Sequence, residues 1–170
     1  MNTTEHETRF RRWLDEHMGL IFKVVRSFAD GASDADDLLQ EILLQVWLSL
    51  PSFRAESKET TWLYRVALNT ALAWKRRESG FRSRRRPLEL VADSLAPSES
   101  GSMSEALAQL YEAIRALPPA DRALMLLHFD GISYSEMAEV IGISESNVGV
   151  RLNRIKKKLT EQLKVPSYDV

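Results

Sequence analysis

Apolar residues recur at intervals of three and four along nearly the whole chain, and this spacing constrains the fold more than any other feature. It is the period of a helix that buries one face. Strand signals are scarce, because no segment sustains a two-residue alternation and no Asn-Gly or Asp-Gly turn joins β-branched runs. Since 44% of the 170 residues are apolar, a packed core is feasible. The sequence therefore predicts an all-α fold.

One segment near the middle of the chain interrupts the helical spacing. Residues 91–104 contain five Ser together with Pro97 and Gly101. Such a composition cannot bury enough apolar surface to order itself. We therefore expect two small helical domains, over residues 8–86 and 105–164, joined by a flexible linker over residues 87–104.

Charge is distributed unevenly, although the formal net charge is only −1. Segment 75–86 holds seven basic residues against one acid, and segment 151–158 holds five basic residues and no acid. Segment 30–41 holds five acids and no base. This segregation indicates one polyanionic partner and a separate surface for a second partner.

Composition and spacing also exclude several classes of protein. The chain has no Cys, which excludes disulfide scaffolds and thiol chemistry. No apolar run approaches the ~18 residues that span a bilayer, and the charged start does not resemble a signal peptide. We therefore expect a cytoplasmic protein without membrane insertion. The three His are scattered, and no phosphate-binding loop, metal-ligand spacing or nucleophile elbow is present, so neither an enzyme nor a cofactor or metal is expected.

Three helices are predicted in the first domain, at about residues 10–28, 34–50 and 61–78. On the second helix, the residues predicted to face the core are Leu39, Ile42, Leu43, Val46 and Leu50. The opposite face is predicted to carry Asp37, Gln40, Glu41 and Leu44. The third helix is predicted to bury Leu63, Val66, Ala67, Thr70 and Trp74. Its other side would present Trp62, Arg65, Asn69 and Arg76, and Trp47 is predicted to join the core.

In the second domain, residues 132–159 are typical of a helix-turn-helix. Ser133 and Glu136 have the spacing of a capping box, and Gly142 supplies the unusual dihedral angles of the turn. Ser144 is predicted to cap a second helix. The predicted buried seam of that helix is Val148, Leu152, Ile155, Leu159 and Leu163, and its predicted outward residues are Asn147, Arg151, Arg154 and Lys158.

The outward residues of this second helix suit DNA recognition. Asn and Arg in the first turns of a recognition helix make bidentate contacts with adenine and guanine. The later Lys156, Lys157 and Lys158 would lie near phosphates. An ordinary helical hairpin with a solvated basic face is the alternative at this point.

Two stretches carry a resemblance to one family. DADDLLQEILLQVWLSLPSF (34–53), followed by TWLYRVALNTALAWKRR (61–77), resembles the second conserved region of bacterial sigma factors, and residues 117–159 resemble the fourth. Their order and the short linker resemble the extracytoplasmic-function branch, which has only these two domains. The resemblance implies a factor that binds core RNA polymerase and directs promoter-specific transcription initiation. It would read minus-ten and minus-thirty-five elements and assist promoter melting.

The resemblance also implies which residues meet which partner. The residues implied to dock on the clamp helices of the largest polymerase subunit are Asp36, Asp37, Leu38, Gln40 and Glu41. Those implied to contact the minus-ten element are Trp62, Arg65, Asn69, Arg76 and Arg77, and the preceding loop, Arg54 to Thr61, would accommodate a flipped base. Those implied to contact the minus-thirty-five element are Ser146, Asn147, Val150, Arg151, Arg154, Lys157 and Lys158. The polymerase flap and an anti-sigma factor, in this family often membrane-anchored, are further implied partners.

The chain departs from the family pattern at Ala73, where an Asp often stands, which affects contacts near that turn. Two other classes of protein are alternatives: a transcriptional regulator that binds duplex DNA without polymerase, and an adaptor whose helical faces bind only proteins. The acidic stripe over residues 36–41 and the aromatic and basic third helix favour the sigma factor over both.

Overall fold

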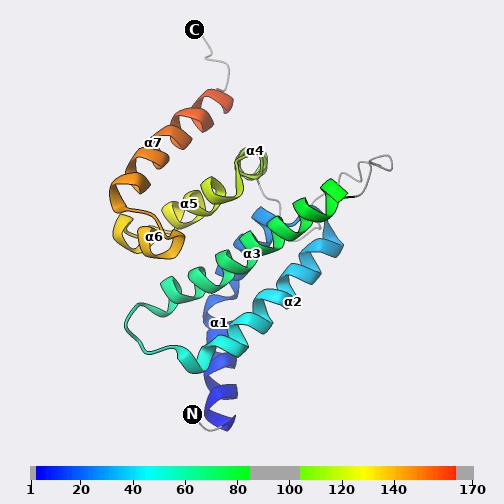
Figure 1. Cartoon of the computed structure of the whole chain (residues 1–170), viewed down its shortest axis with the longest axis vertical. Coiled ribbons are helices and arrows are strands. Elements are labelled where there is room, and N and C mark those ends of the chain that lie inside the picture. Colours follow the sequence, from blue (N-terminus) through cyan, green and yellow to red (C-terminus); the bar gives the residue numbers. More distant parts are fainter. Residues whose placement is uncertain (1–2, 85–103, 164–170) are drawn as a thin grey trace. The chain divides into compact units, whose positions relative to one another are not determined.

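The structure, a computed structural model, describes residues 3–84 and 104–163, and every regular element within these ranges is a helix. The chain divides into two compact units, Met1–Ala96 and Pro97–Val170. Figure 1 shows the elements of each unit. The predicted all-α fold with two helical domains is confirmed. The predicted linker, except Ser104, lies outside the described residues, and the predicted domain limits stay predictions.

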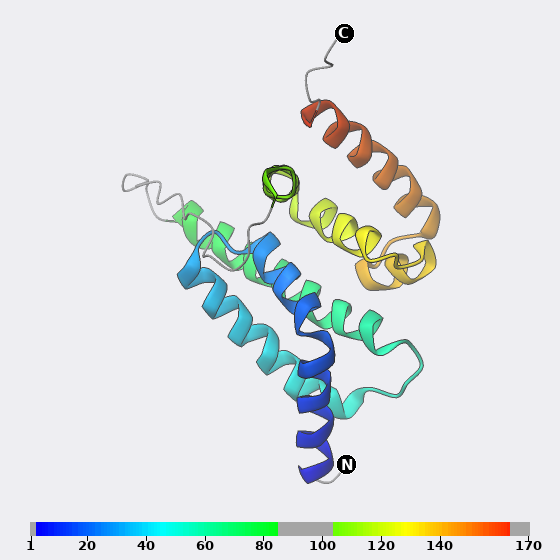
Figure 2. The ribbon, with the colours of Figure 1, turned by 180° about the vertical axis from the view of Figure 1, so that it is seen from behind.

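The first unit is a bundle of three long helices: α1 (Thr3–Phe28), α2 (Ala32–Ser49) and α3 (Glu59–Arg84). A short 3-10 helix, η1 (Leu50–Ser52), follows α2. Each of the three helices packs against the other two, as Figures 1 and 2 show from opposite sides. The largest fully buried side chains of this unit are Trp13, Ile21, Phe28, Leu38, Ile42, Leu50, Leu63, Tyr64 and Leu68.

Helix α1 begins about seven residues earlier than the apolar spacing predicts. His6 explains the extra turns, because its ring stacks on Trp47 with centroids 3.9 Å apart and its Nε2 donates to the Trp47 carbonyl at 3.0 Å. Phe10 meets the same indole edge-on at 5.1 Å. Trp47 is therefore half-buried between α1 and α2 rather than a core residue, which corrects the prediction.

The predicted burial of Ile42, Val46 and Leu50 is confirmed, but Leu38 takes the place of Leu39 and Leu43 in the buried seam of α2. Leu38, Ile42 and Val46, spaced four apart, are fully buried, whereas Leu39 and Leu43 are half-buried. Because α2 packs against both α1 and α3, the row between these two helices is the one that loses contact with water. Leu38, implied above to bind polymerase, therefore belongs to the core.

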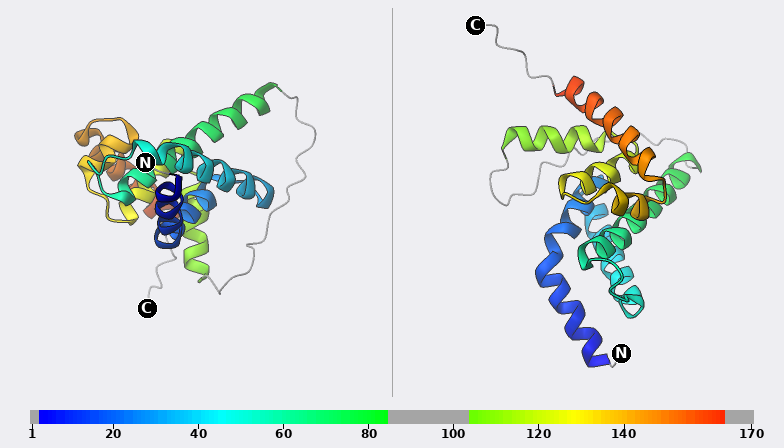
Figure 3. Two further views of the ribbon diagram at one scale, coloured as in Figure 1. Left: turned by 90° about the horizontal axis from the view of Figure 1, so that it is seen from below. Right: turned by 90° about the vertical axis from the view of Figure 1, so that its left-hand side faces the viewer.

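The second unit contains α4 (Glu105–Arg115), α5 (Pro119–Phe129), α6 (Tyr134–Ile141) and α7 (Glu145–Gln162). Helix α5 packs against the other three, and Asp121 to Leu127 are all buried. Figure 3 gives two further views of these helices. On α7 the predicted seam of Val148, Leu152, Ile155 and Leu159 is confirmed, while Leu163 is half-buried.

The predicted turn chemistry of the helix-turn-helix is confirmed. The Ser133 and Glu136 backbone N–H groups each donate to the other residue's side chain at 3.2 Å, which completes the capping box. Gly142 ends α6 in the left-handed region with φ 78°. Ser144 Oγ accepts from the Asn147 backbone N–H at 3.2 Å and starts α7. These local bonds fix where the exposed face of α7 begins.

Candidate functional site

The outward face of α2 is acidic at its start and apolar toward its end. Asp36, Asp37 and Gln40 are exposed, and Glu41 is half-buried. The same face continues with Leu44 and Leu48, which are 50% and 60% exposed. Positions 37, 41, 44 and 48 share one side of a helix, so this face, which we call the docking face, offers carboxylates and an apolar strip. Sequence reasoning placed Leu44 on this face but missed Leu48.

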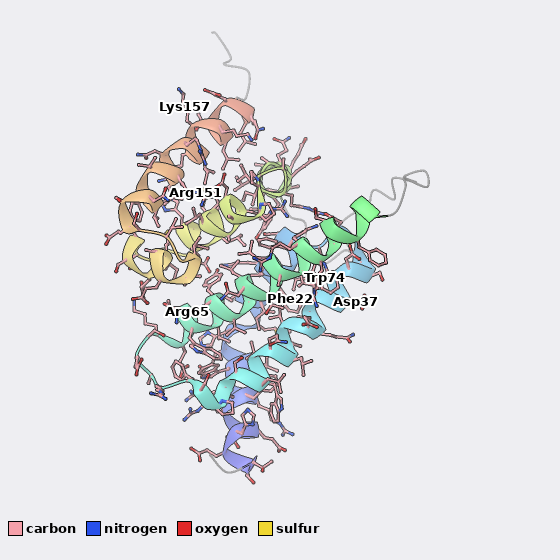
Figure 4. All side chains as sticks on the ribbon, viewed as in Figure 1. Phe22, Asp37, Arg65, Trp74, Arg151 and Lys157 are labelled. Carbon is pink, nitrogen blue, oxygen red and sulfur yellow. The ribbon has the colours of Figure 1, made fainter. Side chains whose placement is uncertain are left out.

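The docking face adjoins the end of α3. Arg77 Nη2 lies 3.9 Å from Glu41 Oε1, and its guanidinium is 5.9 Å from the centre of the Trp74 ring. Trp74, predicted as a core residue, is half-buried. Figure 4 labels Asp37 and Trp74 at the same end of the three-helix unit. A surface suited to a basic partner and a surface suited to nucleic acid thus meet between α2 and α3.

On α3, the predicted outward residues divide into two groups. Asn69, Arg76 and Arg77 are exposed. Trp62 is half-buried, because its ring packs against two aromatic rings. Its ring centroid lies 5.4 Å from that of Trp13 and 5.6 Å from that of Phe53. Arg65, labelled in Figure 4, is also half-buried, with its Nε atom out of solvent. A helical wheel cannot include Phe53, which comes from the loop before α3.

This division predicts different stabilities for two variants. Trp62→Ala should lower the unfolding free energy of the first unit by about 2 kcal/mol, because it removes ring contacts to two aromatic neighbours. Asn69→Ala should change it by less than about 0.5 kcal/mol, because that side chain is exposed. All four Trp lie in the first unit, so tryptophan fluorescence during urea unfolding reports this unit alone. Equal stability of the two variants would contradict the assigned packing.

The loop before α3 borders an open pocket of about 920 Å³. Ala55 in this loop has φ 59°, a left-handed conformation that is unfavourable for a residue with a side chain. The residues that line the pocket are Thr4, Glu5, Thr8, Arg9, Arg12, Phe53, Arg54, Ala55 and Glu59. Guanidinium groups beside an aromatic ring can hold a phosphate and stack on a base.

On α7, most of the predicted DNA contacts lie on one exposed side. Ser146, Asn147, Lys157 and Lys158 are exposed, and Val150 and the Arg154 side chain are 68% and 69% exposed. These positions recur at helical spacing from the capped end into the last third of the helix. The face, which we call the reading face, carries amide, apolar and guanidinium groups first and ammonium groups later; Figure 4 labels Lys157.

Arg151 is the exception on α7. Its Nε donates to Asp121 Oδ1 at 3.1 Å, and its Nη2 donates to the same oxygen. The side chain is only 23% exposed, so the prediction that it faces outward is wrong. Figure 4 shows Arg151 on the first half of α7 beside α5. No local pattern predicts this contact, because Asp121 lies thirty residues earlier in another helix.

Other titratable groups add little to these surfaces. Burial, and then the charge of Lys156, lowers the pKa of His128, so its ring is neutral at neutral pH and does not enlarge the basic surface. Among the described residues, two groups bring possible metal ligands within 4.8 Å of one another: Glu16, His17 and Glu59, and Asp30, Asp34 and Glu78. Arg12 already pairs with Glu59 at 2.8 Å and Lys75 with Asp30 at 2.6 Å. We interpret both as ion-pair clusters. Within the described ranges, no helix is both long and apolar enough to cross a bilayer.

Comparison with known proteins matches both units to one family. The family model for Sigma-70 region 2 matches residues 13–81, and the model for Sigma-70, region 4 matches residues 107–159. RNA polymerase sigma factor SigZ of Bacillus subtilis (strain 168) is 32% identical over 136 residues, which cover 77% of this chain and 73% of that protein. ECF RNA polymerase sigma-E factor of Escherichia coli (strain K12) is 30% identical, with 78% and 75% covered. The chain belongs to the extracytoplasmic-function (ECF) sigma factors.

The fold agrees with this membership. The sigma factor RpoE of Bartonella quintana, solved in complex with the anti-sigma factor NepR, superposes with a TM-score of 0.77 at 23% identity. The match covers 93% of this chain and 98% of that one. As an ECF sigma factor, the protein is a non-enzymatic factor that binds core RNA polymerase and promoter DNA to start transcription. The regulator without polymerase, the protein-only adaptor and the enzyme are thereby set aside.

Proposed function

We propose that this ECF sigma factor divides promoter-specific initiation among three surfaces. The first is the docking face of α2, which binds the clamp helices of the largest polymerase subunit. Exposed Asp36, Asp37 and Gln40 on one side of the helix are the observation that supports this role. Leu38 supports the docking face indirectly, because its buried side chain helps to hold α2 in the three-helix bundle. Leu44 and Leu48 extend the face with an apolar strip that loses contact with water on docking.

The second surface is α3 with the loop before it, which reads and melts the minus-ten element. Asn69, Arg76 and Arg77 are exposed there and contact the DNA directly. Trp62 and Arg65 are half-buried and mainly shape this surface. The pocket beside Ala55 offers arginines and an aromatic ring to a base that has left the stack.

The third surface is the reading face of α7, which binds the minus-thirty-five element. The observation that carries this role is the exposure of Asn147, Val150 and Arg154 at the capped end of the second helix of a helix-turn-helix. Exposed Lys157 and Lys158 follow further along the helix, and in this proposal they bind phosphates. The second unit also contacts the polymerase flap in this proposal.

Regulation and location follow from the same proposal. The similar RpoE structure was solved with an anti-sigma factor, and we expect an anti-sigma factor to bind this chain as well. Such a factor would compete with polymerase if it covered the docking face. Both proposed macromolecular partners, core polymerase and promoter DNA, are in the bacterial cytoplasm, so we place the protein there.

The proposed roles on α7 predict two kinds of DNA defect. Arg154→Ala should weaken holoenzyme binding to the preferred promoter by about 1–3 kcal/mol and relax the preference at one base position. Lys157→Ala should weaken all sequences alike and reduce the salt dependence by about one phosphate contact. Competition binding against single-base variants of the minus-thirty-five element distinguishes the two. Uniform weakening by both substitutions would contradict base reading by Arg154.

A further inference from the structure

A buried carboxylate lies behind the reading face of α7. Asp121, in the first turn of α5, is 6% exposed. Its Oδ1 accepts two hydrogen bonds from Arg151, and its Oδ2 lies 3.6 Å from Arg154 Nη2. The two arginines are three residues apart, so one carboxylate faces two neighbouring cations on the same side of α7. A buried carboxylate requires such partners, because it loses its hydration on folding.

We propose that Asp121 is a positioning residue for minus-thirty-five recognition, a role that rests on the proposed function of α7. The hydrogen bonds to Asp121 hold Arg151 in place, and Arg151 thereby links α7 to α5. Arg154 is attracted to the second oxygen at 3.6 Å, a distance beyond a hydrogen bond, and its side chain stays 69% exposed. The carboxylate therefore limits the rotamers of Arg154 without occupying its donors.

This arrangement affects specific and non-specific binding in opposite directions. An arginine that is already restricted loses less conformational freedom when it meets a base edge, which strengthens the contact to the correct base. The same negative charge repels the phosphates of any duplex, whatever its sequence. Asp121 therefore raises discrimination between promoters and lowers affinity for other DNA.

The test uses Asp121→Asn in the full chain, assembled with core polymerase. Asn keeps the size of the side chain and removes the charge. Binding is measured to the preferred promoter, to variants at the base position that Arg154 reads, and to unrelated duplex DNA. We expect the preference at that position to fall about tenfold, while unrelated DNA binds more tightly. Asp130→Asn, which removes a charge at the other end of α5, is the matched control and should leave the preference unchanged.

A double-mutant comparison separates positioning from support of the fold. If Asp121 acts through Arg154, Asp121→Asn should have no further effect on base preference in the Arg154→Ala protein. A purely structural role would lower specific and non-specific binding by one common factor in both backgrounds, and that result would overturn the proposal. An unchanged preference in folded Asp121→Asn would overturn it as well.

A second variant covers the case in which Asp121→Asn does not fold, and the wild-type result separates this proposal from the proposed function. If Asp121→Asn does not fold, as judged by circular dichroism, Asp121→Glu keeps the charge but displaces the carboxylate by one methylene. It should also lose the base preference, without tighter binding to unrelated DNA, and full retention would overturn the proposal. Failure of the proposed function gives a different result: the wild-type holoenzyme would then show no base preference that Arg154→Ala removes.

Discussion

Reversing Asp37 and Glu41 to Lys should abolish binding to core RNA polymerase while the helices stay intact. The double substitution changes the charge of the docking face by four units, since two negative residues become positive. Opposed like charges at an interface cost several kcal/mol, which is enough to remove most of a typical association. Neither residue is buried in the core, so the bundle beneath should keep its stability. Titration of labelled core polymerase measures the affinity, and circular dichroism checks the helices.

A matched control separates docking from net charge. Glu7 and Asp15 are exposed on α1, and reversing both to Lys makes the same change in total charge on another helix. This control should bind polymerase nearly as tightly as the wild type. Equal loss of binding in both double variants, or wild-type binding by Asp37→Lys with Glu41→Lys, would contradict the assignment of the docking face to α2.

Asn69→Ala should give a holoenzyme that binds promoter DNA but opens it poorly. A base that leaves the duplex loses a few kcal/mol of stacking and pairing, and a protein offsets this only by offering new partners. In the proposed function the exposed amide of Asn69 is such a partner, and its truncation should spare the fold. Trp62→Ala is a less direct probe, because its ring contributes to the packing of the first unit.

Permanganate reactivity of unpaired thymines measures this opening. The Asn69→Ala holoenzyme should show weak reactivity on fully paired promoter DNA, and Ser79→Ala, exposed on the same helix, should match the wild type. A template mispaired across the minus-ten region should rescue a variant defective only in opening, but not one that fails to hold the single strand. Wild-type reactivity of Asn69→Ala on paired DNA would show that this residue has no role in promoter opening.

Features determined by neighbouring residues could be predicted from the sequence. The capping box of Ser133 and Glu136, the left-handed Gly142 and the cap of Ser144 each depend on residues within one turn. The buried seam of α7 also follows from local periodicity, because one face of that helix meets the rest of its unit. The exposure of Asn69 and Arg154 was predicted for the same reason.

Features that depend on distant residues could not be predicted in the same way. Leu38 is buried because α2 lies against two helices, which rotates its seam from the one that a single-helix wheel gives. Trp62 is half-buried because Phe53 folds onto it from outside the helix. Arg151 turns inward because it donates a hydrogen bond to Asp121, which lies on another helix. In each case, a helical wheel identifies the helix and omits the partner that decides exposure.

Run-off transcription with purified core polymerase tests the proposed docking face and minus-ten surface most directly. The template is a fully paired duplex that carries a promoter this factor recognises, and transcripts are compared with and without the protein. We predict a transcript of defined start only with the protein present. It should be lost with the Asp37→Lys and Glu41→Lys protein, and it should be strongly reduced with Asn69→Ala on this paired template. Full transcription by both variants on paired DNA would contradict the proposed surfaces.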